Sequence, residues 1–138
     1  MNKERLQKLF KQYQNAFINY DIDKVSSCYH LPCTLNTPDK IVLLSSLLDC
    51  QQEFGAIFTQ LKDAGISDII AQRASFQQMS EQLYLVCIDW DFVDEQKQTF
   101  ADFAAIYHVL DCNGTLQIVN VVSHELSSSL ALEHALVL

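Results

Sequence analysis

Hydrophobic residues near the start of the chain recur at helical spacing. Between Lys3 and Tyr20 they fall three or four positions apart, at Leu6, Leu9, Phe10, Tyr13, Phe17 and Tyr20. This spacing is typical of an amphipathic helix that buries one face. We therefore predict a first helix over Lys3–Tyr20.

The next segment contains a capping signal and a proline. Asp21–Asp23 predicts the N-cap of a short helix reaching Tyr29, and Pro32 prevents that helix from continuing. A short strand is predicted over Thr34–Thr37. Residues Ile41–Leu44 form either another strand or the lead into a helix.

A third, longer helix is predicted in the middle of the chain. Ser45 or Ser46 supplies its N-cap, and Gly65 supplies the left-handed residue that ends it. Its apolar side chains are Leu47, Leu48, Phe54, Ile57, Phe58 and Leu61.

The second half of the chain has the pattern of β-strands. Four runs rich in β-branched and aromatic residues follow one another with short links, over Asp68–Gln78, Gln82–Val93, Thr99–Asp111 and Thr115–Glu125. Asn113-Gly114 favours a tight type I′ turn. We predict a single α+β domain over residues 1–138, in which the N-terminal helices pack on a strongly curved antiparallel sheet. The apolar tail, residues 127–138, docks on the body, docks on a second subunit or is frayed.

Alternation along the second strand predicts an aromatic face. If the next hairpin places Trp90 opposite Ala101, then Tyr84 lies opposite Tyr107. These aromatic side chains then share one side of the sheet.

The last hairpin is expected to add polar groups to this face. Closure on Asn113-Gly114 sets Tyr107 against Asn120 and Phe103 against His124. A single bulge would exchange the two faces downstream. The opposite face is also too apolar to be wholly solvated, so we expect a second copy of the chain to cover it in a homodimer.

The charge, the cysteines and the absence of certain motifs argue against several classes of function. Nine basic against seventeen acidic residues give a net charge of −8, which disfavours nucleic acid as a partner. The five cysteines are odd in number and form no C-x-x-C motif, so we assign no disulfide framework, metal or cofactor. No phosphate-binding glycine motif occurs. No apolar run is long enough for a membrane span, and we expect a cytoplasmic protein without a membrane partner.

The order of elements resembles the nuclear transport factor 2-like superfamily, which includes ketosteroid isomerase and SnoaL-type cyclases. Tyr13–Asp23 resembles the end of the first helix in that family, and Asn113–Ile118 resembles its penultimate turn. The resemblance covers nearly the whole chain. It implies a cone-shaped fold with an internal pocket between the helices and the sheet.

Residues of ketosteroid isomerase carry over in part. The oxyanion-hole tyrosine falls on Tyr13. The position of the general-base aspartate, before a proline, is held by Thr37, and Asp39 lies two residues later. The position of the protonated aspartate falls near Ile106 or Tyr107, neither of which is a carboxylic acid.

Three functions fit these observations, and the first is favoured. It is binding of a small, largely apolar molecule in the cone, by Tyr13, Tyr84, Trp90, Phe103, Tyr107, Asn120 and His124. A second is a protein–protein interaction module that uses the outer sheet face and the tail. A third is an isomerase, cyclase or dehydratase, in which Tyr13 is the oxyanion donor and His124 or Asp39 is the base.

Overall fold

The computed structural model of the protein describes residues 2–138, so Met1 of the predicted domain lies outside the described part. In chain order the elements are α1 (Asn2–Ile18), α2 (Ile22–Ser27), β1 (Tyr29–Thr37), β2 (Lys40–Leu44), α3 (Leu47–Asp63), β3 (Ile66–Gln78), β4 (Leu83–Asp94), β5 (Thr99–Cys112), β6 (Thr115–His124), the 3₁₀ turn η1 (Leu126–Ser128) and β7 (His134–Ala135). The α+β class predicted from the sequence is confirmed.

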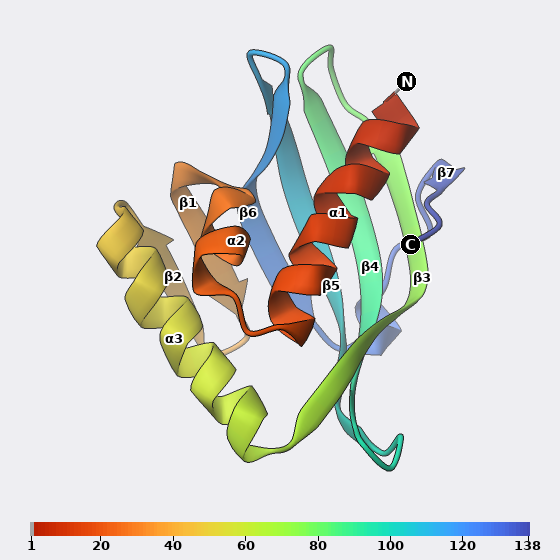
Figure 1. Ribbon diagram of the computed structural model, residues 1–138. Helices are drawn as coiled ribbons and strands as arrows, with labels where there is room; N and C mark the ends of the chain where they lie inside the picture. Colours follow the sequence, from red (N-terminus) through yellow and green to blue (C-terminus); the bar gives the residue numbers. More distant parts are fainter. Residues whose placement is uncertain (1) are drawn as a thin grey trace.

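The helices lie together on one face of the sheet, as Figure 1 shows. The stripe predicted for α1 is buried there, with Leu6 and Phe10 fully inaccessible. Helix α1 ends two residues earlier than predicted, because Tyr20 takes a left-handed conformation (φ 52°) that closes the helix. The Ser46 hydroxyl caps α3 by accepting a hydrogen bond from the backbone N–H of Asp49.

Strand β1 begins earlier than the sequence predicts. Helix α2 ends at Ser27 instead of Tyr29, and Tyr29 is the first residue of β1. Pro32 is tolerated within the strand because it lies where the pairing with β6 shifts register, between Tyr29 and Thr34. For Ile41–Leu44, the strand alternative is correct.

The sheet is larger than the predicted meander. Its strand order is β2-β1-β6-β5-β4-β3-β7. The antiparallel meander from β3 to β6 is confirmed. However, β1 also pairs with β6 in parallel, which the sequence analysis did not predict.

The register between β4 and β5 differs from the prediction by two residues. Trp90 lies opposite Phe103, not Ala101, and Tyr107 lies opposite Val86, not Tyr84. The turn decides this register, because the Asp94 carboxylate accepts backbone hydrogen bonds within the connecting loop and a bulge follows at the base of the hairpin. A shift of two keeps every side chain on its face, so the aromatic face is retained.

The hairpin between β5 and β6 contains a bulge that the sequence analysis did not place. Val109 pairs with Ile118 as predicted, but His108 then pairs with Asn120. The extra residue exchanges the two faces of β6 from that point onward. Asn120 and His124 therefore lie on the outer face, and the prediction that they join the aromatic face is wrong.

The C-terminal segment docks on its own chain. Strand β7 pairs with β3, and Leu136 is 4% exposed. The hydroxyl of Ser129 donates a hydrogen bond to the Asp89 carboxylate, and the backbone N–H of Leu130 contacts the Cys87 thiol. Part of the outer sheet face that we assigned to a partner chain is thus covered by this segment.

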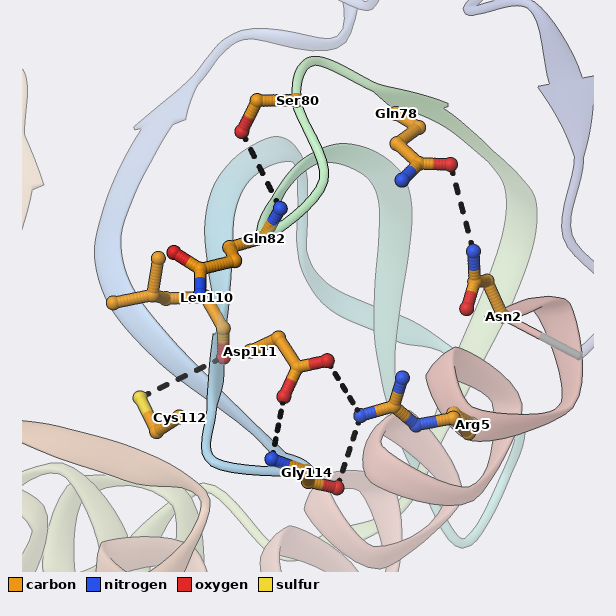
Figure 2. Close-up of polar contacts among 9 residues, drawn as sticks. All are labelled: Asn2, Arg5, Gln78, Ser80, Gln82, Leu110, Asp111, Cys112 and Gly114. Carbon is orange, nitrogen blue, oxygen red and sulfur yellow. Dashed lines mark hydrogen bonds and ion pairs between the residues drawn. The ribbon is translucent and has the colours of Figure 1, made fainter.

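The start of α1 is fixed to the hairpin between β5 and β6. The Arg5 guanidinium donates to the Asp111 carboxylate at 3.0 Å and to the carbonyl oxygen of Gly114 at 2.9 Å (Figure 2). The same carboxylate accepts the backbone N–H of Gly114. Asn113 and Gly114 both have positive φ, as a type I′ turn requires.

Candidate functional site

A cavity with a volume of about 230 Å³ lies between the helices and the inner face of the sheet. Its walls come from two helices and five strands. The lining residues are Tyr13 and Phe17 of α1, Tyr29, Leu35, Asn36 and Thr37 of β1, Lys40 and Val42 of β2, Glu53, Phe54 and Ile57 of α3, Trp90 and Phe92 of β4, Phe103, Ala105 and Tyr107 of β5, and Val121 and Ser123 of β6.

Four of the residues that the sequence named as ligand-binding line this cavity. They are Tyr13, Trp90, Phe103 and Tyr107. Tyr84 shares their face of the sheet, but it is 1% exposed and packs in the core away from the cavity. The structure thus brings together the aromatic part of the predicted site without Tyr84.

The buried end of the cavity carries a chain of hydrogen bonds between aromatic side chains. The indole N–H of Trp90 donates to the Tyr107 hydroxyl at 2.8 Å. The Tyr107 hydroxyl donates to that of Tyr13 at 3.2 Å. Tyr29 lies beside Tyr13 and interacts with the same hydroxyl. These four side chains come from α1, β1, β4 and β5, so one helix and three strands bring their polar aromatic groups into contact.

Burial keeps these phenols protonated. It raises the pKa of Tyr13 above the ordinary value near 10, and it raises the pKa of Tyr29 and Tyr107 well above it. Each hydroxyl therefore retains a hydrogen to donate at neutral pH. This end of the cavity offers hydrogen-bond donors without a charge.

The opposite end of the cavity opens to solvent between β2 and α3. Lys40 and Glu53 line it and form an ion pair with an N···O distance of 3.7 Å. The Glu53 side chain is 20% exposed, whereas that of Lys40 is 58% exposed. The two charges offset each other, so the mouth has no strong preference for a charged ligand.

Asn120 belongs to a polar network rather than to the cavity. Its side-chain oxygen accepts hydrogen bonds from Thr34 at 2.6 Å and from Asn36 at 2.7 Å. Its amide nitrogen contacts Nδ1 of His108 at 3.1 Å. These bonds hold β1, β6 and β5 together, so the side chain is used structurally.

His124 and Asp39 also lie outside the cavity lining. His124 pairs with Ala104 on the outer face, and its Nε2 is buried without a hydrogen-bond partner among residues 2–138. Asp39 is exposed in the turn between β1 and β2, where a bond from the Thr37 hydroxyl lowers the pKa of its carboxyl. The structure therefore does not bring the proposed catalytic residues Tyr13, His124 and Asp39 together.

Sequence reasoning missed Tyr29, Lys40 and Glu53. Tyr29 was assigned to the end of a helix, which concealed its alternation in β1. Glu53 precedes Ile57 by four positions on α3, so the two residues share one helix face, and this spacing was a usable signal. Lys40 had no comparable signal, because only the pairing of β1 with β2 directs it to the cavity.

The described residues contain neither a candidate metal site nor a membrane span. Within residues 2–138, no three His, Cys, Asp or Glu side chains cluster in a way that would hold a metal ion. None of the helices in that range is both long enough and apolar enough to cross a membrane.

Solved structures resemble this chain in fold at low sequence identity. An NTF-2 like protein of unknown function from Shewanella oneidensis MR-1 matches with a TM-score of 0.72 and 16% identity, over 89% of this chain and 98% of that one. A Nostoc punctiforme protein with a cystatin-like fold gives 0.71 and 12%, over 88% of each chain. An NTF2-like protein from Novosphingobium aromaticivorans gives 0.72 and 9%, over 91% and 82%. At these identities the likeness shows the fold alone.

Sequence comparison gives the family. None of the curated proteins matches this sequence. The family model described as NTF2-like protein (DUF6841) matches residues 3–126, which is most of the chain and includes all three helices and the strands that line the cavity. On this match, the chain belongs to the NTF2-like proteins of the DUF6841 family.

Proposed function

We propose that the protein binds a small, uncharged, largely apolar molecule that carries one hydrogen-bond acceptor, in the cavity between the helices and the sheet. The observation that carries the proposal is the donor chain of Trp90, Tyr107 and Tyr13 at the buried end of a mostly apolar cavity. Apolar walls with a few convergent polar groups are the usual composition of small-molecule sites.

The hydrogen-bond donors at the buried end of the cavity define the polar group of the ligand. Trp90 donates to Tyr107, and both Tyr107 and Tyr29 donate to Tyr13, which leaves the hydroxyl hydrogen of Tyr13 for a ligand. A carbonyl, ether or hydroxyl oxygen of a ligand can accept it. A carboxylate would lose its hydration in an apolar space that lacks a buried cation, at a cost of several kcal/mol.

The size of the cavity restricts the ligand further. Its volume of about 230 Å³ lies below the ~300–1,000 Å³ range of pockets for drug-sized ligands. A one-ring or two-ring molecule is therefore the upper limit without movement of the walls.

A matched set of probes tests this proposal. We expect 1-tetralone, a neutral bicyclic ketone, to raise the melting temperature by about 3–6 °C at roughly ten times its Kd. Tetralin, which lacks the oxygen, should stabilise less, and 1-naphthoate should not stabilise. Equal shifts with tetralone and tetralin would show that the phenols do not select the ligand.

Two variants locate the binding. Ile57→Trp fills the cavity from α3 and should abolish the shift with tetralone, because Ile57 lines the cavity. Asn120→Ala is the control, since Asn120 lies outside the cavity in the outer network. If Ile57→Trp folds and still binds tetralone, the ligand occupies another place.

A proton-transfer enzyme is the second candidate, and one observation favours it. Glu53 lines the same cavity as Tyr13 and holds a carboxylate that can serve as a base, a role that we had assigned to His124 or Asp39. In this alternative Tyr13 donates to the developing oxyanion. Exchange of the α-hydrogens of 1-tetralone in D₂O, measured by NMR, should be accelerated by the wild type and not by Glu53→Gln. No acceleration over buffer would leave binding as the function.

A further inference from the structure

Four apolar side chains are exposed within eight residues of β2 and the start of α3. Their exposed fractions are 75% for Ile41 and 61% for Leu43 on β2, and 53% for Leu47 and 60% for Leu48 on α3. Single exposed apolar side chains are common, but four within one short stretch of the chain favour an interaction site. Strand β2 is also the edge of the sheet in Figure 1.

The free edge of β2 offers main-chain hydrogen bonds as well. Within residues 2–138, β2 pairs only with β1. Thr37 and Lys40 form the hydrogen-bonded pair that flanks the two-residue turn. Hydrogen-bonded and non-hydrogen-bonded pairs alternate along an antiparallel ladder, so the N–H and C=O groups of Ile41 and Leu43 point away from β1. An apolar edge with unpaired groups is a template for another strand. The other end of the sheet is already occupied, because β7 covers β3 there.

We propose that β2 of a second copy of this chain pairs antiparallel with this edge, about a two-fold axis at Val42. In this register Ile41 lies opposite Leu43 of the partner subunit, on the convex face of the sheet. Ile41 and Leu43 are the residues whose main-chain groups point outward. In this register each of them forms a hydrogen-bonded pair with the other residue of the partner subunit, which gives two such pairs. The strand is complementary to itself, as a two-fold interface requires.

The charges around β2 also fit this arrangement. Lys40 is the one charged residue of the strand, and the two-fold axis places the two copies of it at opposite ends of the paired strands. In this register each Lys40 lies opposite Leu44 of the partner subunit, at the end of β2 that leads to Asp49 and the start of α3. In each copy the Asp49 carboxylate accepts the backbone N–H of Ser45 at 2.9 Å, which holds the negative charge at that end of β2. The register thus sets a basic residue beside the end of the partner strand that carries an acidic one, although the net charge of each chain is −8.

The oligomeric state of designed variants tests the interface. By size-exclusion chromatography with light scattering at about 100 µM, we expect the wild type at twice the 15.7 kDa mass of the chain. The double variant Ile41→Lys and Leu43→Lys should run at half the wild-type mass, since lysine on an edge strand blocks pairing. The matched control Phe100→Lys, at a side chain that is 53% exposed on β5, should stay dimeric.

A second control separates this interface from the outer sheet face. Ile106→Lys changes a half-buried side chain on that face and should also stay dimeric. A monomeric wild type overturns the proposal and would mean that β2 does not pair with a second copy of the chain. A dimer that survives the double variant, or one that only Ile106→Lys dissociates, overturns it as well.

Hydrogen exchange of the wild type tests the same contact without any substitution. The amides of Ile41 and Leu43 should exchange at least about tenfold more slowly at high than at low protein concentration, because only the dimer pairs them. The amide of Val42 faces β1 and reports the intact hairpin. Concentration-independent exchange at Ile41 and Leu43 would contradict the two-fold pairing.

Discussion

At the scale of single residues, the Tyr107 hydroxyl is the centre of the buried polar chain. It accepts from Trp90 and donates to Tyr13, and all three side chains are at most 7% exposed. Tyr107→Phe leaves the indole N–H without a partner and should lower the free energy of unfolding by about 1–3 kcal/mol. Tyr13→Phe keeps the bond between Trp90 and Tyr107 and should cost less, because the Tyr107 hydroxyl can still accept from the indole. Urea denaturation measures both, and an unchanged stability in Tyr107→Phe would show that the chain of bonds contributes nothing.

At the scale of elements, the C-terminal segment contributes stability through one anchoring side chain. Leu136 is 4% exposed, its backbone N–H bonds to the carbonyl of Ala74, and its neighbour Val137 is 69% exposed. Leu136→Ala should lower the free energy of unfolding by about 2–4 kcal/mol, because it leaves a cavity where the segment meets the core. Val137→Ala should stay within about 0.5 kcal/mol of the wild type. Equal values in urea denaturation would mean that the segment docks without stabilising the fold.

At the scale of the whole molecule, buried thiols and phenols make the stability of the fold sensitive to alkaline pH. Burial raises the pKa of the Cys28 and Cys33 thiols from 9.0 to about 12. A raised pKa means that the folded state holds the proton more tightly, so this stability is complete below pH 9 and is lost as the pH rises towards 12. The phenols of Tyr13, Tyr29 and Tyr107 act in the same direction above pH 10.

We therefore expect the melting temperature to fall steadily between about pH 9 and pH 11. Calorimetry measures it, and most of the phenolate absorbance should appear together with unfolding, because four of the five tyrosines, Tyr13, Tyr29, Tyr84 and Tyr107, are buried. The double variant Cys28→Ala and Cys33→Ala is the control, because its melting temperature should decline less steeply over the lower part of this range. A constant melting temperature up to pH 11 would contradict the burial of these groups.

The sequence by itself determined the helices, the meander and the aromatic face. The stripe of α1 and the alternation of β4 each follow from local periodicity, because a side chain that repeats every 3.6 or 2 residues faces one way whatever surrounds it. The turn at Asn113-Gly114 was equally local, since few residues tolerate positive φ. These signals sufficed to place Tyr13, Trp90, Phe103 and Tyr107 on the same side.

The tertiary structure alone decided which polar groups face the cavity. One extra residue in β6 sends Asn120 and His124 to the outer face, and no periodicity marks its position. Tyr29 reaches the cavity because β1 pairs with β6, a contact between residues distant in the sequence. Periodicity therefore determines which faces are apolar, whereas bulges and long-range strand pairing determine which polar side chains meet.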